Sequence, residues 1–209
     1  MLALDTDTMP GLALSLGLDV APARLPAGLA EWIEGKGWRL LGKGVGAGFL
    51  VDRHAAVGPD GIRYLELGKL PGQVEPAVTV AYRHVMERFR RPGWTLVADL
   101  AAGTRQAMFG WARFAPVRVI VADASVKSLI TARRLRVVGT HLVANRVRGE
   151  SDLRAIRGAT DLPLLATIPY DDEVAEAERC GRAPIDFAPR SPAVVAAARL
   201  TERLEELGS

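Results

Sequence analysis

The sequence predicts an α/β protein in which a mostly parallel sheet carries helices on both faces. Short apolar runs, several of which end on a polar residue, alternate with stretches of helical periodicity, as is typical of parallel sheets. The 209 residues are 49% hydrophobic and 24% charged, which is ordinary for a soluble globular protein and sufficient for a large core. We therefore expect one α/β domain over residues 1–209.

The first half of the chain predicts strands and helices on either side of an irregular segment. The apolar run 2–5 is the first strand, and a proline at position 10 opens a helix over 10–16. Residues 20–60 are rich in Gly and Pro and predict an insertion, with Trp32 and Trp38 as anchors. A strand over 61–67 precedes a helix over 74–90, in which apolar residues recur at helical spacing.

The second half predicts strands that alternate with helices. The expected strands are 94–99, 117–122, 140–145 and 162–168, and the expected helices are 125–138, 151–158 and 192–207. Ser125 is placed to cap the first of these helices. We expect the strand 94–99 to be buried and the closing helix to cover the sheet with its apolar side.

Composition excludes several classes of protein. The single cysteine, Cys180, excludes an internal disulfide and a Cys–Cys metal site within one chain, and the three histidines show no metal-ligand spacing. No apolar run approaches the roughly 18 residues of a membrane span, and Asp5 and Asp7 interrupt any secretory signal. A cytoplasmic location with no membrane partner is therefore expected. The net charge of +3 permits weak attraction to nucleic acid without requiring it.

Asp5 and Asp7 lie at the carboxyl end of the first predicted strand. Ligands of an open parallel sheet bind beyond those ends, where a carboxylate can hold a magnesium-bound water or position an attacking water. The alternative is a capped turn before the helix that starts near Pro10, because aspartate favours such positions.

Asp99 ends the apolar strand 94–99 and is followed by Leu-Ala-Ala-Gly103. An aspartate at a strand end suits the binding of magnesium, either directly or through water. Gly103 has no Cβ, so its backbone amide could approach a γ-phosphate. The alternative is an ordinary turn from strand to helix.

Asn145 and Arg146 end the predicted strand 140–145. The Asn145 amide offers one acceptor and two donors, enough to read the edge of a purine, and Arg146 could stack on the ring. The backbone around Pro169, at the end of the last strand, could line the same base pocket. The alternatives are a turn Asn and a surface Arg, and a helix that starts at 171 with Asp171 as its cap.

The glycine-rich segment 42–48 contains Lys43 but does not match a phosphate-binding loop. Such a loop needs Gly, four residues and then Gly-Lys-Ser/Thr at the start of a helix, whereas no Ser or Thr follows Lys43. Residues 49–51 (Phe-Leu-Val) predict a strand. We interpret this segment as a loop without a phosphate site.

Arginines cluster at three places: 88–91, 133–136 and 146–157. Such clusters usually mark solvated helix ends. The alternative is that these arginines form a surface patch that binds the phosphates of DNA.

Together, the order and spacing of these segments resemble the MinD/ParA family of P-loop ATPases, and within it the CooC-like branch that matures nickel enzymes. Residues 2–17 are similar to the family's Asp-x-Asp strand and the helix after it, and 97–103 to its Walker B strand and switch II. Residues 67–90 look like the branch's central segment. Residues 142–147 resemble the adenine-recognition strand, and 168–181 the final strand and helix.

This resemblance implies a role for each candidate residue. Asp5 or Asp7 would act near the attacking water, Asp99 would lie near Mg²⁺, and Gly103 would sense the γ-phosphate. Asn145 would contact adenine. The implied cofactors are ATP and Mg²⁺. Because family members work as ATP-gated dimers, the implied partner is a second copy or an intact ATPase.

The sequence departs from the family at two places. The family's first strand and its phosphate-binding loop, with its lysine, precede the Asp-x-Asp strand, and neither occurs in the sequence. We expect either a start further upstream or a degenerate member, and poor or no ATP hydrolysis by this chain. The closely spaced cysteines of the CooC-like branch are absent from 71–76, which weighs against a metal-bridged dimer and against nickel insertion.

Two other functions stay open. The first is a non-catalytic interaction protein on the same scaffold, because loss of the first strand would expose a central sheet edge or leave an apolar gap, and an exposed edge invites pairing with another chain. The second is nonspecific DNA binding through the arginine clusters.

Overall fold

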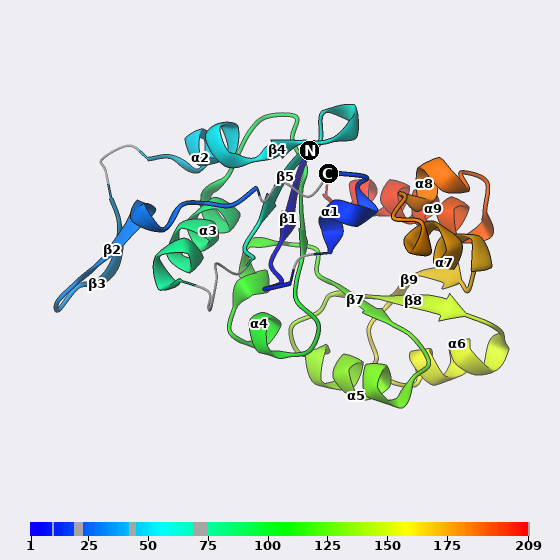
Figure 1. Ribbon diagram of the computed structural model, residues 1–209. Helices are drawn as coiled ribbons and strands as arrows, with labels where there is room; N and C mark the ends of the chain where they lie inside the picture. Colours follow the sequence, from blue (N-terminus) through cyan, green and yellow to red (C-terminus); the bar gives the residue numbers. More distant parts are fainter. Residues whose placement is uncertain (10, 19–22, 42–44, 69–74, 209) are drawn as a thin grey trace. The chain divides into compact units, whose positions relative to one another are not determined.

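The computed structural model describes residues 1–9, 11–18, 23–41, 45–68 and 75–208, which form two compact units (Figure 1). The first unit is Met1–Ala102 and the second is Gly103–Ser209. Both units alternate strands and helices, so the predicted α/β class is confirmed. That all 209 residues form one domain stays a prediction. None of the described helices is both long and apolar enough to cross a membrane.

The first unit is built on a four-stranded sheet in the order β4-β5-β1-β6. Its central strand β1 (Leu2–Asp5) pairs in parallel with β5 (Arg63–Glu66) and with β6 (Leu96–Asp99). The short strand β4 (Ala56–Val57) joins β5 antiparallel. The carboxyl ends of β5, β1 and β6 therefore meet at one edge of the sheet.

Helices cover both faces of this sheet (Figure 1). The short helix α1 (Leu12–Ser15) packs Ala13 against Ala3 and Tyr64 on one face. The helix α3 (Pro76–Arg88) carries Tyr82, whose hydroxyl donates to the main-chain oxygens of Asp5 (2.8 Å) and Leu65 (3.0 Å). Its predicted apolar stripe is confirmed, since the whole stripe is buried: Val78, Tyr82, Val85, Met86 and Phe89.

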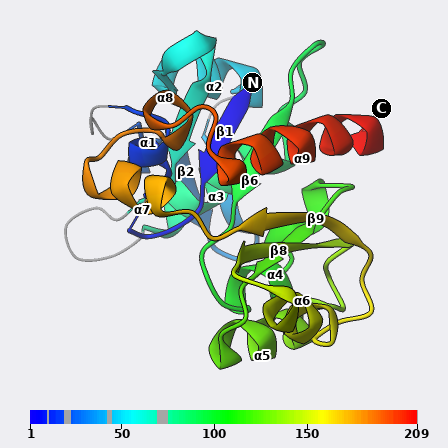
Figure 2. The ribbon, with the colours of Figure 1, turned by 90° about the vertical axis from the view of Figure 1, so that its right-hand side faces the viewer.

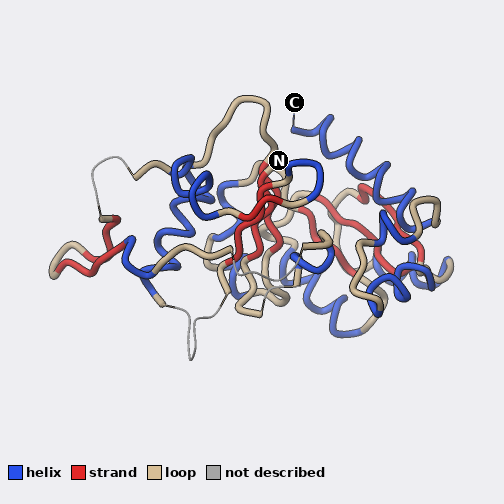
Figure 3. Tube along the Cα trace, turned by 45° about the horizontal axis from the view of Figure 1, so that its top comes forward, coloured by secondary structure: helices blue, strands red, loops and turns tan. Residues whose placement is uncertain are grey.

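Residues 23–61 contain more regular structure than their composition predicts. An antiparallel hairpin, β2 (Ala30–Ile33) with β3 (Gly37–Leu40), stands apart from the four-stranded sheet in Figure 3. Trp32 and Trp38 meet edge to face across it with ring centroids 6.0 Å apart. Short 3-10 turns, η1 (Ala27–Leu29) and η2 (Pro59–Gly61), flank the segment.

The predicted strand at 49–51 is wrong, because these residues lie inside the helix α2 (Ala47–His54). Leu50 and Val51 are buried on one side of α2 while Phe49 is exposed, which is the spacing of a helix and not of a strand. The run is too short for its apolar residues to distinguish the two, and α2 contacts α3 within the same unit. Gly42, Lys43 and Gly44 lie outside the described residues, as do residues 69–74 of the segment that resembles the CooC-like branch.

The prediction that the strand 94–99 is buried is also wrong. Among the described strands, β6 pairs only with β1, so it is an edge strand. Its side chains alternate between half-buried and exposed, and Val97 is 50% exposed. An apolar run does not distinguish an edge strand from a central one.

The second unit is built on the parallel sheet β7-β8-β9. Its strands are β7 (Val119–Ala122), β8 (His141–Val147) and β9 (Leu164–Pro169). In Figure 2, α5 (Val126–Leu135) and α6 (Glu150–Arg157) lie on one side of the sheet and α9 (Pro192–Gly208) on the other. The sheet face toward α5 and α6 forms an apolar core of Ile120, Ala122, Leu142, Ala144, Ala132 and Ile156.

Shorter elements complete the second unit: α4 (Arg105–Met108), η3 (Trp111–Phe114), α7 (Asp172–Arg179) and α8 (Pro184–Phe187). The predicted cap at Ser125 is confirmed, because its hydroxyl accepts the Ser128 backbone N–H. The predicted end of a strand at Asn145 is wrong, since β8 continues to Val147 with irregular pairing to β9 after Ala144.

Candidate functional site

Three carboxylates stand side by side at the carboxyl ends of the first unit's strands. The sheet register pairs Asp5 of β1 with Glu66 of β5 on one side and with Asp99 of β6 on the other. Residues paired in this way point to the same face of a parallel sheet. We call Glu66, Asp5 and Asp99 the carboxylate row. Three negative charges on neighbouring strands repel one another unless each is balanced separately.

Asp5 is balanced by backbone N–H groups of the turn that follows it. One of its oxygens accepts the N–H of Asp7 (2.9 Å), and the other accepts the N–H groups of Gly11 and Leu12 (3.0 Å each) at the start of α1. The side chain is buried, with 1% of the residue exposed. This geometry matches the capped-turn alternative for Asp5, and a catalytic role for it stays a prediction.

Thr6 fastens the end of β1 to the end of β6, a function that the sequence pattern did not reveal. Its backbone N–H (3.0 Å) and its hydroxyl (2.9 Å) both donate to the main-chain oxygen of Asp99. The same hydroxyl oxygen accepts the N–H of Ala101 (3.1 Å), and the residue is fully buried. Thr6 therefore fixes the position at which Asp99 leaves the sheet.

Glu66 is balanced by Arg24, a pairing that no local sequence pattern predicts. The Arg24 Nε donates to the Glu66 carboxylate at 2.6 Å, and the Tyr64 hydroxyl donates to its other oxygen at 3.0 Å. The guanidinium rests on Gly68, where an added Cβ would lie 2.2 Å from Nε. Gly68 also has a φ of +58°, so glycine is required there on two counts.

Asp7 and Asp99 keep carboxylate oxygens free. One oxygen of Asp7 accepts the Met9 N–H (3.0 Å), and in the described part of the chain neither its other oxygen nor the Asp99 carboxylate accepts a hydrogen bond. Although Asp99 is open to solvent on one side, partial desolvation by its surroundings and the nearby charges of Asp5 and Asp7 raise its pKa. The negative charge at this edge is therefore only partly balanced.

These free oxygens fit one kind of metal site and not another. Within the described residues, no group of three or more His, Cys, Asp or Glu side chains is arranged to enclose a metal ion. Mg²⁺ is commonly held by one or two carboxylates and completes its shell with water and phosphate oxygens. Asp7 and Asp99 could supply such carboxylates.

The raised pKa of Asp99 predicts that this side chain costs stability at neutral pH. A carboxyl whose pKa is raised by folding favours the folded state at low pH, and that contribution is lost as the pH rises through the raised pKa. Asp99→Asn should therefore raise the melting temperature at pH 7 by about 1–2 °C, a small value because the group is partly solvated. The gain should disappear near pH 3. Thermal unfolding of both proteins at the two pH values tests this, and a lower melting temperature for Asp99→Asn at pH 7 would contradict it.

In the second unit, Asn145 and Arg146 form a distorted step within β8. Arg146 has a φ of +54°, which is uncommon for a residue with a Cβ, and its N–H donates to the Asn145 side-chain oxygen (3.0 Å). In the described part of the chain, the Asn145 side-chain NH₂ donates no hydrogen bond. Asn145 thus keeps the two donors that the predicted adenine contact needs. Asp123, which follows β7, has a lowered pKa because the Ser125 hydroxyl and N–H donate to it and Arg146 lies nearby.

At the end of β9, the interpretation of Asp171 as the cap of a helix is confirmed. Asp171 caps α7 by accepting the Glu173 N–H (3.0 Å), and it also accepts the N–H of Ala193 (3.0 Å) in α9. Pro169 ends β9, and the next residue, Tyr170, lies under the guanidinium of Arg148 at 3.9 Å from the ring centroid.

Gly103 adopts a φ of +99° and is exposed. A residue with a Cβ is strained in this conformation, so the backbone shape at 103 depends on glycine. The predicted approach of its amide to a phosphate needs the same freedom and stays a prediction.

Comparison with known proteins supplies the fold but no close relative. No protein-family model matches the sequence, and no curated protein matches it either. Among solved structures, the chain is similar to the septum site-determining protein MinD of Pyrococcus horikoshii OT3, complexed with Mg-ADP. The TM-score is 0.70 at 21% identity over 100% of this chain and 84% of that one.

Two further solved structures agree. MinD in the MinC:MinD cell division complex of Aquifex aeolicus gives a TM-score of 0.67 at 17% identity, over 98% of this chain and 83% of that one. A ParA family ATPase of Chlorobium tepidum TLS gives 0.67 at 16% identity, over 97% and 84%. The chain has the fold of the MinD and ParA ATPases.

Proposed function

We propose that the chain is a MinD/ParA-type nucleotide-dependent switch in which Asp7 and Asp99 face the magnesium ion of a bound nucleotide. The observation that carries this proposal is the unequal balance of charge at the carboxyl ends of β5, β1 and β6. Asp5 and Glu66 are satisfied by protein donors, whereas Asp7 and Asp99 keep free oxygens and the pKa of Asp99 is raised. A cation at this edge would relieve that repulsion.

Each residue has a definite task in this account. Asp99 would hold Mg²⁺ directly or through water, and Asp7 would orient a water molecule next to it. Bound Mg²⁺ would neutralise negative charge on the nucleotide phosphates. Asp5 and Thr6 hold the two turns in place. Gly103 would offer its amide to a phosphate, and Asn145, Arg146 and the backbone at Pro169 would contact the base.

The MinD of P. horikoshii is complexed with Mg-ADP, and that of A. aeolicus is complexed with MinC. These neighbours support ATP or ADP with Mg²⁺ as the ligand of this chain and a protein as its client. This proposal also includes dimer formation, a cytoplasmic location, and a role in metalloenzyme maturation or in partitioning.

Mn²⁺ is the probe that locates the metal directly, because it replaces Mg²⁺ and broadens nearby NMR signals. Titration of the full chain should broaden the amide signals of residues 6–8 and 98–101 first, at submillimolar to millimolar Mn²⁺. Asp99→Asn and Asp7→Asn should each weaken this effect by about tenfold, the equivalent of about 1.4 kcal/mol.

Asp60→Asn is the matched control for this titration. It removes one exposed carboxylate of the same unit at a positive φ that asparagine tolerates. This variant should behave like the unmodified chain. Broadening that is uniform along the sequence, or equal in all three variants, would contradict a magnesium site at this edge.

A second candidate function, an interaction protein on this scaffold, rests on the free edge of β6. Its register with β1 directs the backbone groups of Val97 toward β1 and those of Leu96 and Ala98 away from it. Within the described residues, these outward groups have no partner strand. Such an edge can accept a strand from a second copy or from an intact ATPase. Light scattering that shows a monomer at all concentrations, with no complex recovered from cells, would count against it.

DNA binding, the third candidate, depends on the arginines of the second unit. Arg91 of the first cluster is already bound to Asp52 at 2.7 Å and 3.0 Å. Exposed arginines without an ion-pair partner in the described chain remain on α5 and α6: Arg133, Arg134, Arg154 and Arg157. Retention on DNA at low salt that weakens steeply as salt rises would support this candidate, and no retention would remove it.

A further inference from the structure

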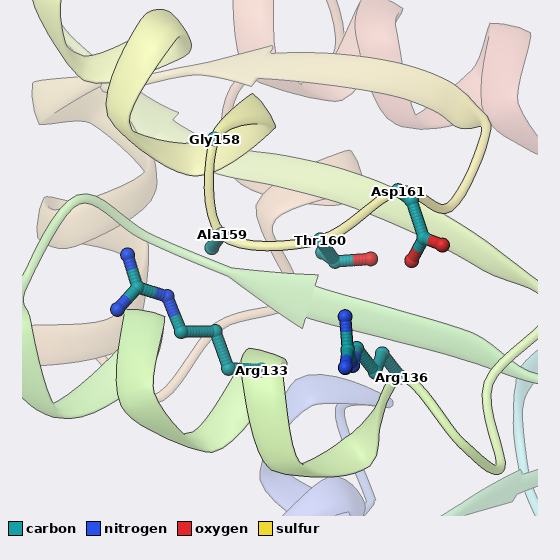
Figure 4. Close-up of a pocket in the computed structure, with 6 residues that line it drawn as sticks. All are labelled: Arg133, Arg136, Gly158, Ala159, Thr160 and Asp161. Atoms are coloured by element: carbon teal, nitrogen blue, oxygen red, sulfur yellow. The ribbon is translucent and has the colours of Figure 1, made fainter.

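The second unit contains a cavity of about 550 Å³ that none of the candidate site residues lines. Figure 4 shows it between the end of α5 and the loop from α6 to β9, where it is lined by Arg133, Arg136, Gly158, Ala159, Thr160 and Asp161. This loop precedes β9, so the cavity lies at the amino-terminal end of that strand. Asn145 and Pro169 lie toward the carboxyl ends of β8 and β9. We propose that the cavity binds a small phosphorylated molecule that also carries hydroxyl groups, of the sugar phosphate class.

The charge of the cavity comes from two guanidinium groups. Arg133 and Arg136 are three residues apart at the end of α5, and both side chains border the cavity in Figure 4. In the described part of the chain, neither of them forms an ion pair, although Asp161 lines the same cavity. The negative end of the helix dipole accounts for basic residues at this position. It does not account for a cavity that both arginines line. Guanidinium groups bind phosphate through paired hydrogen bonds.

Thr160 adds a neutral donor. Its hydroxyl oxygen already accepts the Leu162 N–H at 2.9 Å, which leaves the hydroxyl hydrogen to be donated. The N–H groups of Gly158 and Ala159 donate to the carbonyls of Arg154 and Ile156, so these two amides are occupied. The phosphate would therefore be held by Arg133, Arg136 and Thr160 rather than by a ring of backbone amides.

Asp161 decides the class of ligand. Its carboxylate would repel a simple inorganic anion, but it is a strong acceptor for a hydroxyl group that lies beside a bound phosphate. A ligand with both groups uses every polar side chain of the cavity. The volume lies within the range of about 300–1,000 Å³ that is typical of small-molecule sites. Ribose 5-phosphate is a suitable probe, since it carries both groups and fits easily.

The test is a calorimetric titration of the full chain with ribose 5-phosphate, inorganic phosphate and ribose. We expect one ribose 5-phosphate to bind per chain. Arg133→Gln and Arg136→Gln should each weaken this binding at least tenfold, and Thr160→Val should weaken it about threefold, as expected for one neutral hydrogen bond. Asp161→Asn should weaken binding of ribose 5-phosphate but strengthen binding of inorganic phosphate. Ribose alone should not bind.

Arg190→Gln is the matched control, because Arg190 is exposed in the same unit and does not line the cavity. It should leave the affinity unchanged, and the Arg133, Arg136, Asp161 and Arg190 variants should keep the melting temperature of the unmodified chain, whereas Thr160→Val also loses the acceptor of the Leu162 N–H. Loss of affinity in Arg190→Gln equal to that in the cavity variants, or no binding of ribose 5-phosphate, would overturn the proposal. So would equal sensitivity to Arg154→Gln and Arg157→Gln together with displacement by duplex DNA, because that result assigns the arginines to a DNA surface.

Discussion

Replacing Arg24 by methionine is expected to lower the free energy of unfolding by about 3 kcal/mol, because it would leave the buried Glu66 carboxylate without its counter-charge, although the Arg24 side chain itself is 26% exposed. Arg24 is the cation that balances Glu66, whose side chain is only 3% exposed. Without it, the Glu66 carboxylate would be left, within the described part of the chain, with the Tyr64 hydroxyl as its partner. Methionine keeps much of the length and apolar volume of the arginine side chain, so the loss reports mainly on the charge. Chemical denaturation at pH 7 measures it.

The exposed pair Arg179–Glu176 supplies the control for this prediction. Its side chains are 75% and 41% exposed, so Arg179→Met should cost less than about 0.5 kcal/mol. Equal effects of the two substitutions at pH 7 would show that the Arg24–Glu66 pair does not stabilise the first unit.

Replacing Asp5 by alanine is also expected to cost about 3 kcal/mol, because its buried carboxylate is the acceptor of three part-buried N–H groups, and the loss of such an acceptor costs about 1–3 kcal/mol where water cannot replace it. The N–H groups of Asp7, Gly11 and Leu12 all donate to this side chain. Asp5→Asn keeps one acceptor oxygen and should lose about half as much. Denaturant unfolding of the three proteins gives both values.

Asp7→Ala is the companion variant in this experiment. Its carboxylate accepts the N–H of the exposed residue Met9, which water can satisfy after the substitution. We expect a loss below about 1 kcal/mol. Asp5 is assigned as a structural anchor and Asp7 as a free carboxylate. This assignment is wrong if Asp7→Ala destabilises the protein as much as Asp5→Ala does.

Much of the fold could be predicted because the apolar spacing of its elements is regular. The stripe of α3 and the strands β1, β7 and β9 lie within two residues of their predicted bounds or inside them. The helix α2 was missed because Phe49, Leu50 and Val51 form a run too short to show its period. The exposed edge at β6 was missed because an apolar strand does not reveal how many neighbours it has.

The candidate site was likewise predictable from the sequence only in part. Strand-end aspartates are visible in a sequence, so Asp5, Asp7 and Asp99 could be selected together. Their different surroundings could not be predicted, because the oxygens of Asp5 accept N–H groups of a turn whose geometry appears only after folding. The Arg24–Glu66 pair joins residues 42 positions apart and follows no local pattern. Thr6 was overlooked because its two carbonyl bonds to Asp99 span 93 positions.

The measurement that tests the central claim most directly is calorimetric titration of this chain with ADP and ATP in the presence and absence of Mg²⁺. If Asp99 faces the magnesium ion of a bound nucleotide, binding should require Mg²⁺ and should weaken about tenfold or more in Asp99→Asn, while Asp60→Asn binds like the unmodified chain. No nucleotide binding with Mg²⁺ present, or equal binding by Asp99→Asn, would contradict the account.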